Sequence, residues 1–341
     1  MSYYSGVAAG QIRLLSARRD VEAVLADPDT APETKAQLAR VAGILAFSRE
    51  RLQLEVGDRY ATYVELPRSH LVWNVFAAPE FDTSGKRWCY PIVGCAVYRG
   101  YFHEQGAMDE ARALERRGFD TYVGGVAAYS TLGWFDDPLV STFIGWRDEQ
   151  LAELLFHELA HSRVFIRDDA GFNEAFASFV GQRGVVEWFE QREIDPSDYL
   201  VGERAQRKLF DFLVDWRGRL GDIYAMSIAD DQKRRLKAAS FEAMHGCYQR
   251  YRDQLGAGRF DRYMSRPFNN ARLLTVGTYH RWVAAFEALF RQADGDWSVF
   301  YQLAGDLSEL PFEVRQQRLE MLAEEQITHR PDDENADEIQ C

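Results

Sequence analysis

Two histidines and a glutamate occur at a spacing that is typical of metal-binding catalytic motifs. The segment His157-Glu158-Leu159-Ala160-His161 is an H-E-x-x-H motif. Apolar residues at helical spacing surround it, so we expect a helix on which His157 and His161 lie about 40° apart. Two imidazoles so placed can bind one Zn²⁺, while Glu158 points toward the open coordination position. Two unrelated histidines on a surface helix are the alternative interpretation.

A catalytic zinc ion has three protein ligands and a water molecule, and Glu174 is the candidate third ligand. Glu174 lies in the next predicted helix, and the 12 residues after His161 suffice for a turn that brings the two helices alongside each other, antiparallel. The alternative is a carboxylate that only interacts with the dipole of its own helix. We predict one Zn²⁺ per chain on His157, His161 and Glu174. Glu158 would be the general base on a zinc-bound water.

The elements that must position these residues change in character along the chain. Helical patterns fill residues 1–60, and short β-branched and aromatic runs with one inserted helix fill residues 61–146. Helical patterns resume over residues 147–328, before an acidic tail at 329–341 that we expect to be disordered. The sequence therefore predicts an α+β fold, with a small mixed β-region followed by a mainly helical half. The absence of a Pro/Gly/Ser-rich linker favours one integrated unit.

Composition excludes several classes of protein. The chain has 341 residues, a formal net charge of −13 and 46% hydrophobic residues, enough to bury a large core. The acidic balance argues against nucleic acid as a partner, because phosphate binding needs a basic face. No stretch approaches the ~20 apolar residues of a membrane helix, and the first residues lack the pattern of a signal peptide.

The four cysteines are unevenly placed. Cys89 and Cys95 flank a segment with Pro91 and Gly94 that could fold back on itself. Either the two form a disulfide, which would imply an oxidising compartment, or they are separate buried thiols. We expect Cys247 and Cys341 to be unpaired.

Longer segments carry a family resemblance. His157 to His161 followed by Asn173-Glu174-Ala175 resembles the gluzincin metallopeptidases. More closely, the chain resembles a bacterial family of predicted zinc aminopeptidases, over most of its length from Tyr3 to about Phe300. The shared segments are Trp73 to Glu80, Trp88 to Cys95, Tyr122 to Val126, Ala128 to Pro138, the H-E-x-x-H motif and Phe268 to Leu273.

The resemblance implies further site residues. In gluzincins an extended strand upstream of the zinc helix holds the substrate backbone, which makes the β-rich part the substrate-binding part. The helical half supplies a Tyr or His that stabilises the oxyanion, here Tyr279 with His280 as the alternative. The alternative for the Gly-rich segment is an ordinary internal strand with a bulge. The alternative for Tyr279 is an aromatic residue that only packs in the core. The implied substrate-binding residues are Gly124, Gly125, Val126, Tyr129, Asn270 and Arg272, and Asn269 would line the same cleft.

One departure from the resemblance concerns the substrate's free amine. Better-known gluzincin aminopeptidases place a carboxylate in the Gly-rich strand to bind that amine, and residues 124–128 contain none. Asp136 or Asp137 could bind it instead, although Asp-Asp-Pro is common in turns. We expect a zinc peptidase, specifically an aminopeptidase acting on peptides. The alternatives are a zinc endopeptidase, or a non-catalytic envelope binding or scaffold protein with a structural or relic zinc site.

The same resemblance suggests a location. Relatives commonly carry an export signal that ends in a lipid-modified cysteine just before a Tyr-Tyr segment like Tyr3-Tyr4. We therefore expect a mature lipoprotein of the periplasm or cell envelope that lacks its signal, and a Cys89–Cys95 disulfide would fit. A cytoplasmic protein is the alternative.

Overall fold

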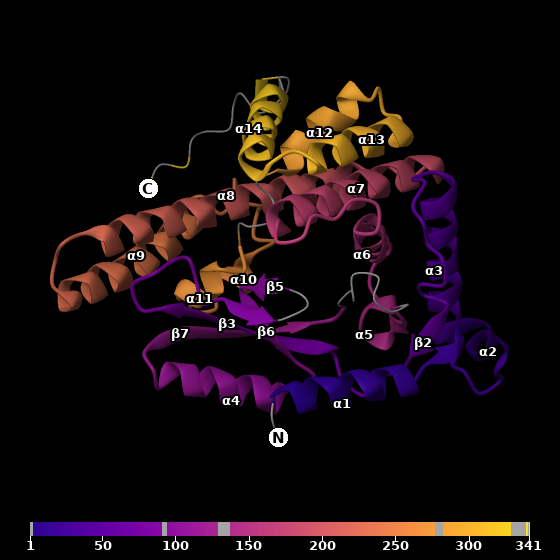
Figure 1. Ribbon diagram of the computed structural model, residues 1–341, viewed down its shortest axis with the longest axis horizontal. Coiled ribbons are helices and arrows are strands. Elements are labelled where there is room, and N and C mark those ends of the chain that lie inside the picture. The colour runs from indigo at the N-terminus through magenta and orange to yellow at the C-terminus, as the bar shows by residue number, and fades with distance from the viewer. Residues whose placement is uncertain (1–2, 91–93, 129–136, 277–281, 329–338, 340) are drawn as a thin grey trace. The chain divides into compact units, whose positions relative to one another are not determined.

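The computed structural model describes residues 3–90, 94–128, 137–276, 282–328, 339 and 341. The chain forms two compact units, each built from segments that are distant in the sequence. Figure 1 labels the helices and strands that belong to them. Unit 1 takes Met1–Val72, Gly125–Pro196 and Arg281–Pro331, and unit 2 takes Trp73–Gly124, Ser197–His280 and Asp332–Cys341. Each unit closes its core with segments from both halves of the chain.

Unit 1 is mainly helical. Its helices are α1 (Tyr3–Ser16), α2 (Val21–Ala26), α3 (Pro32–Glu50), α5 (Ser141–Ile144), α6 (Asp148–Ala160), α7 (Ala170–Gln191), α12 (Val283–Gln292), α13 (Trp297–Ser308) and α14 (Phe312–Thr328). A small sheet has the strand order β1 (Arg19–Asp20), β2 (Thr62–Val64) and β8 (Leu139–Val140). β1 runs antiparallel to β2, and β8 runs parallel to it with Tyr63 opposite Leu139.

α6 and α7 are the central pair of unit 1. Glu174 of α7 lies beside His157 and His161, whereas Gly181 lies beside Glu153 and His157, so the two helices run antiparallel. Glycines allow this close approach: a Cβ at Gly184 would lie 2.7 Å from the Phe156 ring, and one at Gly181 would lie 3.1 Å from the Glu153 carbonyl oxygen. The close contact brings residues of the two helices within reach of one another.

The other side of α7 forms the aromatic core of unit 1. Phe172, Phe176, Phe286 and Phe300 are fully buried. Phe176 stacks on Phe300 of α13 with ring centroids 5.8 Å apart, and Phe172 meets Phe286 of α12 edge to face at 5.1 Å. These contacts with α12 and α13 fix the orientation of α7, so that the opposite side of its first turns faces α6.

Unit 2 combines the larger sheet with helices. The sheet has the order β6 (Tyr98–Tyr101), β3 (Val72–Pro79) and β7 (Phe119–Val126), and β4 (Trp88–Tyr90) pairs with β5 (Gly94–Ala96). β3 and β6 run antiparallel with Trp73 opposite Tyr101. The helices are α4 (Glu104–Glu115), α8 (Ser197–Ala225), α9 (Asp230–Arg250), α10 (Asp261–Met264) and α11 (Asn270–Leu273).

The α+β prediction is confirmed, and its reasons are visible in unit 2. Trp73, Val75 and Ala77 alternate along β3 and pack on Ala107, Ala111 and Leu114 of α4. These two sets have the periodicities of a strand and of a helix, which is why both elements were predictable. Among the described residues no strand follows Val140. Residues 329–338 and 340 of the predicted tail lie outside the described residues.

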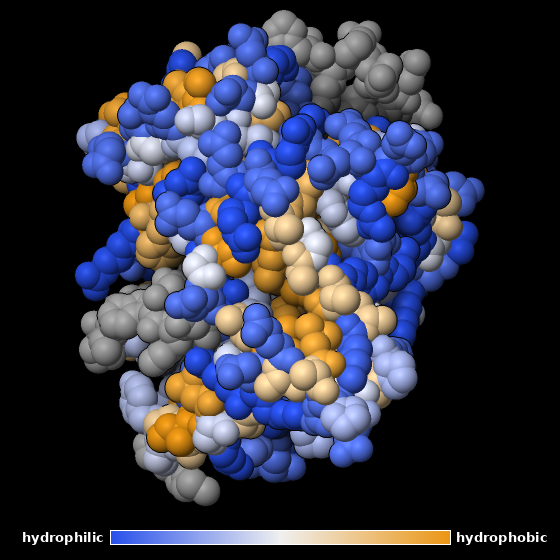
Figure 2. Space-filling view, turned by 90° about the vertical axis from the view of Figure 1, so that its right-hand side faces the viewer, coloured by the Kyte–Doolittle hydropathy of each residue, from blue (hydrophilic) through white to orange (hydrophobic). Residues whose placement is uncertain are grey.

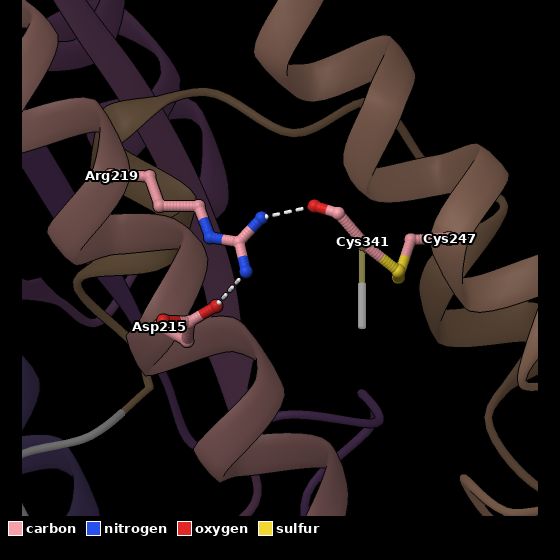
Figure 3. Close-up of a disulfide and its surroundings, with 4 residues drawn as sticks. All are labelled: Asp215, Arg219, Cys247 and Cys341. Carbon is pink, nitrogen blue, oxygen red and sulfur yellow. Dashed lines mark hydrogen bonds and ion pairs between the residues drawn. A yellow bond between two sulfur atoms is a disulfide. The ribbon is translucent and has the colours of Figure 1, made fainter. Parts of the chain in front are cut away.

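The structure contains two disulfides. Cys89 and Cys95 oppose each other across β4 and β5 and are bonded. The expectation that Cys247 and Cys341 are unpaired is wrong, because the fold joins them across 94 residues, a pairing that spacing cannot indicate (Figure 3). Nη1 of Arg219 also donates to the Cys341 carbonyl oxygen at 2.7 Å, and Asp215 pairs with the same guanidinium.

Hydrophilic residues cover most of the molecular face that Figure 2 displays, with apolar residues gathered in parts of it. None of the helices that the structure describes has the length and apolar character needed to cross a membrane.

Candidate metal centre

The structure brings His157, His161 and Glu174 together in unit 1. Nε2 of His157 lies 3.2 Å from Nε2 of His161 and 3.3 Å from Oε2 of Glu174. Nε2 of His161 lies 3.8 Å from Oε1 of Glu174. Among the described residues this is the one cluster of metal-ligating side chains, and all its donor atoms lie within 4.8 Å of one another.

These separations fit a zinc ion. Ligands bonded to tetrahedral zinc at 2.0–2.1 Å lie about 3.3 Å from each other. The three donor separations of 3.2, 3.3 and 3.8 Å surround that value. Two imidazole nitrogens and one carboxylate oxygen are also a donor set that zinc prefers in catalytic sites. The side-chain exposures of 21%, 6% and 31% for His157, His161 and Glu174 leave access from one side.

α6 presents the two histidines because its apolar residues fix its orientation. Leu151, Leu155 and Leu159 are fully buried, which turns the helix so that His157 faces α7. His161 follows the last residue of the helix but keeps helical dihedral angles, φ −57° and ψ −20°. It therefore stays one turn beyond His157, as the spacing of the motif predicts.

The loop between α6 and α7 determines where Glu174 lies. Asp169 caps α7 by accepting a hydrogen bond from the Phe172 N–H at 3.1 Å. The Asn173 amide bonds both backbone groups of Ile166, receiving its N–H at 2.8 Å and donating to its carbonyl at 2.7 Å. Asn173, the residue just before Glu174, is thus bonded to the loop. These contacts at the start of α7 fix the position of Glu174.

Electrostatics distinguish the two histidines. Burial, helped by the charge of His157 and opposed by that of Glu174, lowers the pKa of His161 to about 4. Burial also acts to lower the pKa of His157, but the hydrogen bond to Glu174 and the nearby carboxylates outweigh it and raise that pKa. The pKa of Glu174 is lowered, because the contacts with both histidines outweigh its burial. Without metal, the proton of the cluster therefore belongs on His157, between Glu174 and a neutral His161.

Glu158 also has neighbours outside the metal cluster, which sequence reasoning did not find. Burial raises the pKa of the Tyr60 phenol well above its usual value, and the charges of Glu158 and Asp137 add to the shift. All three residues line one small cavity. Tyr60 has a positive φ of 66° and lies in a loop without regular periodicity, so nothing in the sequence indicated it.

The predicted substrate-binding residues of β7 have structural partners. The Leu71 N–H donates to the carbonyl of Val126 at 2.8 Å. The His70 ring packs so closely on Gly125 that a Cβ there would lie 2.4 Å from it. Gly124 directly precedes Gly125 in β7 and belongs to unit 2. Their predicted contact with substrate stays a prediction.

Asn269, Asn270 and Arg272 of unit 2 hold its fold together. Asn269 caps α11, and the Asn270 amide bonds Tyr224, Pro79 and Glu80. Arg272 donates to the backbone carbonyls of residues 263, 266 and 267, and its guanidinium lies 3.8 Å from the centre of the Phe268 ring. These contacts are sufficient reason for the burial of Asn270 and Arg272. Tyr129, Asp136, Tyr279 and His280 lie outside the described residues.

Comparison with known proteins identifies the chain's family. A family model described as "Putative aminopeptidase" matches residues 2–319. No curated protein and no solved structure matches the chain. The match takes in all of α6 and α7, and with them the three clustered side chains. Since it spans nearly the whole sequence, the chain belongs to this family of putative aminopeptidases.

Proposed function

We propose that the protein is a zinc-dependent aminopeptidase that hydrolyses peptides at their free N-terminus. The observation that carries the proposal is the convergence of Nε2 of His157, Nε2 of His161 and a Glu174 carboxylate oxygen at mutual distances of 3.2 to 3.8 Å. Family membership supports the peptidase class and the preference for N-termini. Together they favour a catalytic site over a structural or relic one.

The chain's own residues would carry the proton transfers. A zinc ion on the three ligands would supply a Lewis acid for the scissile carbonyl and would lower the pKa of water. Glu158 follows His157 directly in α6 and accepts the proton of the attacking water. It then delivers this proton to the leaving amine. Tyr279 would donate a hydrogen bond from its phenol to the oxyanion.

β7 would hold the substrate backbone. In the part of the sheet that the structure describes, β7 is a terminal strand, so an extended peptide could pair with its outer edge.

We also propose that the protein works in the periplasm or cell envelope. Two disulfides and no free cysteine support this location, since disulfides persist in oxidising compartments.

The test combines metal analysis with hydrolysis. The isolated protein should contain one zinc ion per chain and release the first residue from short peptides. Glu158→Gln should abolish hydrolysis and leave zinc content unchanged, because only the base is lost. Glu149→Gln, in the first turn of the same helix and paired with Arg147, is the matched control and should stay active.

Three outcomes would contradict parts of the proposal. Retained activity in Glu158→Gln would refute the role of the base. Equal cleavage of N-acetylated and free peptides would indicate an endopeptidase. Zinc without any hydrolysis across a peptide library would favour a binding or scaffold protein.

A further inference from the structure

One small cavity of unit 1 has the candidate catalytic base in its wall but none of the three candidate metal ligands. The space open to the centre of a water molecule is about 20 Å³, which suffices for one water and for nothing larger. Most of the wall is apolar, and the polar side chains among the described residues that line it are Tyr60, Asp137 and Glu158. A water molecule in this cavity is therefore distinct from one on the metal.

The three polar side chains have complementary hydrogen-bonding groups. The phenol of Tyr60 has one O–H to donate, whereas the ionised carboxylates of Asp137 and Glu158 can only accept. Burial and the charges of the two carboxylates outweigh the charge of Arg59 and raise the pKa of the phenol well above its usual value, so it keeps its proton. A water molecule can accept the hydrogen bond of the phenol and has two protons to donate, one for each carboxylate. One water thus satisfies the whole set.

The backbone holds Tyr60 in an unusual conformation at this place. Its φ of 66° lies in the left-handed region, which is unfavourable for a residue with a bulky side chain. Among the described non-glycine residues with a positive φ, Tyr60 is the only buried one. Its N–H donates to the Asp137 carbonyl at 2.9 Å, and the carbonyl of the next residue, Ala61, accepts from the Val21 N–H at 2.9 Å. Strained residues that their surroundings fix in this way are commonly functional.

We propose that the cavity holds one water molecule that links the Tyr60 phenol to the carboxylates of Asp137 and Glu158, and that Tyr60 thereby positions the catalytic base. The inference rests on the proposed function, in which Glu158 accepts the proton of the attacking water. A glutamate side chain has several rotamers, and only those that bring its carboxylate to the attacking water are productive. The cavity water holds one carboxylate oxygen and leaves the other to accept the proton.

Crystallography of the metal-free protein tests the water molecule without relying on activity. In the wild-type protein an ordered water should lie within hydrogen-bond distance of Oη of Tyr60 and of a carboxylate oxygen of Glu158. In Tyr60→Phe this water loses its donor, and Glu158 should occupy more than one rotamer. A wild-type cavity without an ordered water, or a Glu158 side chain that keeps its single rotamer in the variant, would overturn the inference.

Hydrolysis tests the positioning role. Tyr60→Phe keeps the ring and removes the hydroxyl, so kcat should fall about tenfold, whereas KM and zinc content should stay unchanged because Tyr60 touches neither substrate nor metal. Tyr301→Phe is the matched control. Tyr301 is as buried as Tyr60 in the same unit, and its hydroxyl donates to the Leu52 carbonyl at 2.8 Å. This control should keep the wild-type kcat, and equal losses in the two variants would overturn the inference.

A double-mutant cycle shows whether Tyr60 acts through Glu158. Glu158→Asp keeps a carboxylate but withdraws it from the cavity by one methylene, so Tyr60→Phe should lower kcat by about twofold or less in this background. A purely structural role of the phenol would lower kcat by the same factor in both backgrounds, which would contradict the proposal.

The outcomes separate this inference from the proposed function. A wild-type protein that hydrolyses no peptide refutes the proposed function, and the role of Tyr60 falls with it. An active wild-type protein with an equally active Tyr60→Phe variant refutes the role of Tyr60 alone. If Tyr60→Phe folds poorly, the wild-type crystal structure still decides whether the water is present.

Discussion

Arg315 holds Asp169 by two hydrogen bonds to the same carboxylate oxygen, from Nε at 3.0 Å and from Nη2 at 2.8 Å. The other oxygen of Asp169 caps α7 at Phe172. Nη1 of Arg315 donates to the carbonyls of Ser308 and Leu310, so the guanidinium joins the end of α13 to the start of α7. A residue of α14 thus supports the helix that carries Glu174 without touching the metal centre.

Arg315→Met should destabilise unit 1 strongly. The side chains of Arg315 and Asp169 are 5% and 7% exposed, and removal of one partner leaves a buried charge without compensation. The expected loss is about 3–5 kcal/mol in the free energy of unfolding, measured by urea denaturation of the metal-free protein. Zinc affinity should fall as well, because the first turn of α7 loses its anchor.

The control for this prediction is Arg19→Met. Arg19 forms an ion pair with Asp27 in the same unit, but its side chain is 54% exposed. Such surface pairs contribute about 1 kcal/mol or less. Equal losses in the two variants would contradict the role given to the buried pair.

Gly184→Ala should loosen the contact between α6 and α7. The added Cβ would lie 2.7 Å from the Phe156 ring and 2.8 Å from Leu52, so the helices must move apart. We expect about 1–3 kcal/mol of destabilisation and a weaker zinc site, measured by urea denaturation and by competition with a chelator. Gly43→Ala is the matched control, because a Cβ there meets nothing within 4 Å in α3, and it should stabilise by about 0.5–1 kcal/mol.

Zinc binding should release a proton from His157. Its pKa is raised by Glu174 and the neighbouring carboxylates, whereas His161, with a pKa of about 4, is already neutral. Below the pKa of His157, titrations in buffers of different ionisation enthalpy should show release of about one proton per zinc ion. The His157→Ala variant cannot serve as a control, because it should not bind zinc at all. The control is the pH series itself, in which proton release must vanish above the pKa of His157.

The same shift gives the sign of a stability effect in the metal-free protein. The folded pKa of His157 lies above its unfolded value, so its stabilising interaction is fully present below the unfolded pKa. It is lost as pH rises through the folded pKa. The metal-free protein should therefore lose stability over this interval, whereas the His157→Ala variant should not show that loss.

The features that could be predicted from the sequence are those with local signatures. His157 and His161 follow from helical geometry, and the strand and helix periods of Trp73–Ala77 and Ala107–Leu114 gave the α+β class. The proximity of Tyr60 to Glu158 and that of Arg315 to Asp169 could not be predicted, because each joins segments about 100 or more residues apart. These contacts are determined by tertiary packing, which has no characteristic spacing in the sequence.

The pairing of Cys247 with Cys341 should stabilise unit 2 more than the pairing of Cys89 with Cys95. In the chain-entropy model a disulfide contributes more when it closes a longer loop, about 5 kcal/mol for a separation of 94 residues against about 2 kcal/mol for 6. The double variant Cys247→Ala/Cys341→Ala also separates the Cys341 carbonyl from Arg219. Faster hydrogen exchange of α9 amides is the expected result, measured by mass spectrometry.

The double variant Cys89→Ala/Cys95→Ala is the control for this last prediction, and its effect should stay within β4 and β5. Before either variant is made, alkylation of the unreduced protein should label no cysteine, since all four are paired. Labelling of Cys247 and Cys341 without reductant would contradict the bond. Unchanged exchange in α9 after loss of the bond would show that the closed loop contributes little, because the packing of α8 and α9 then suffices to hold unit 2 together.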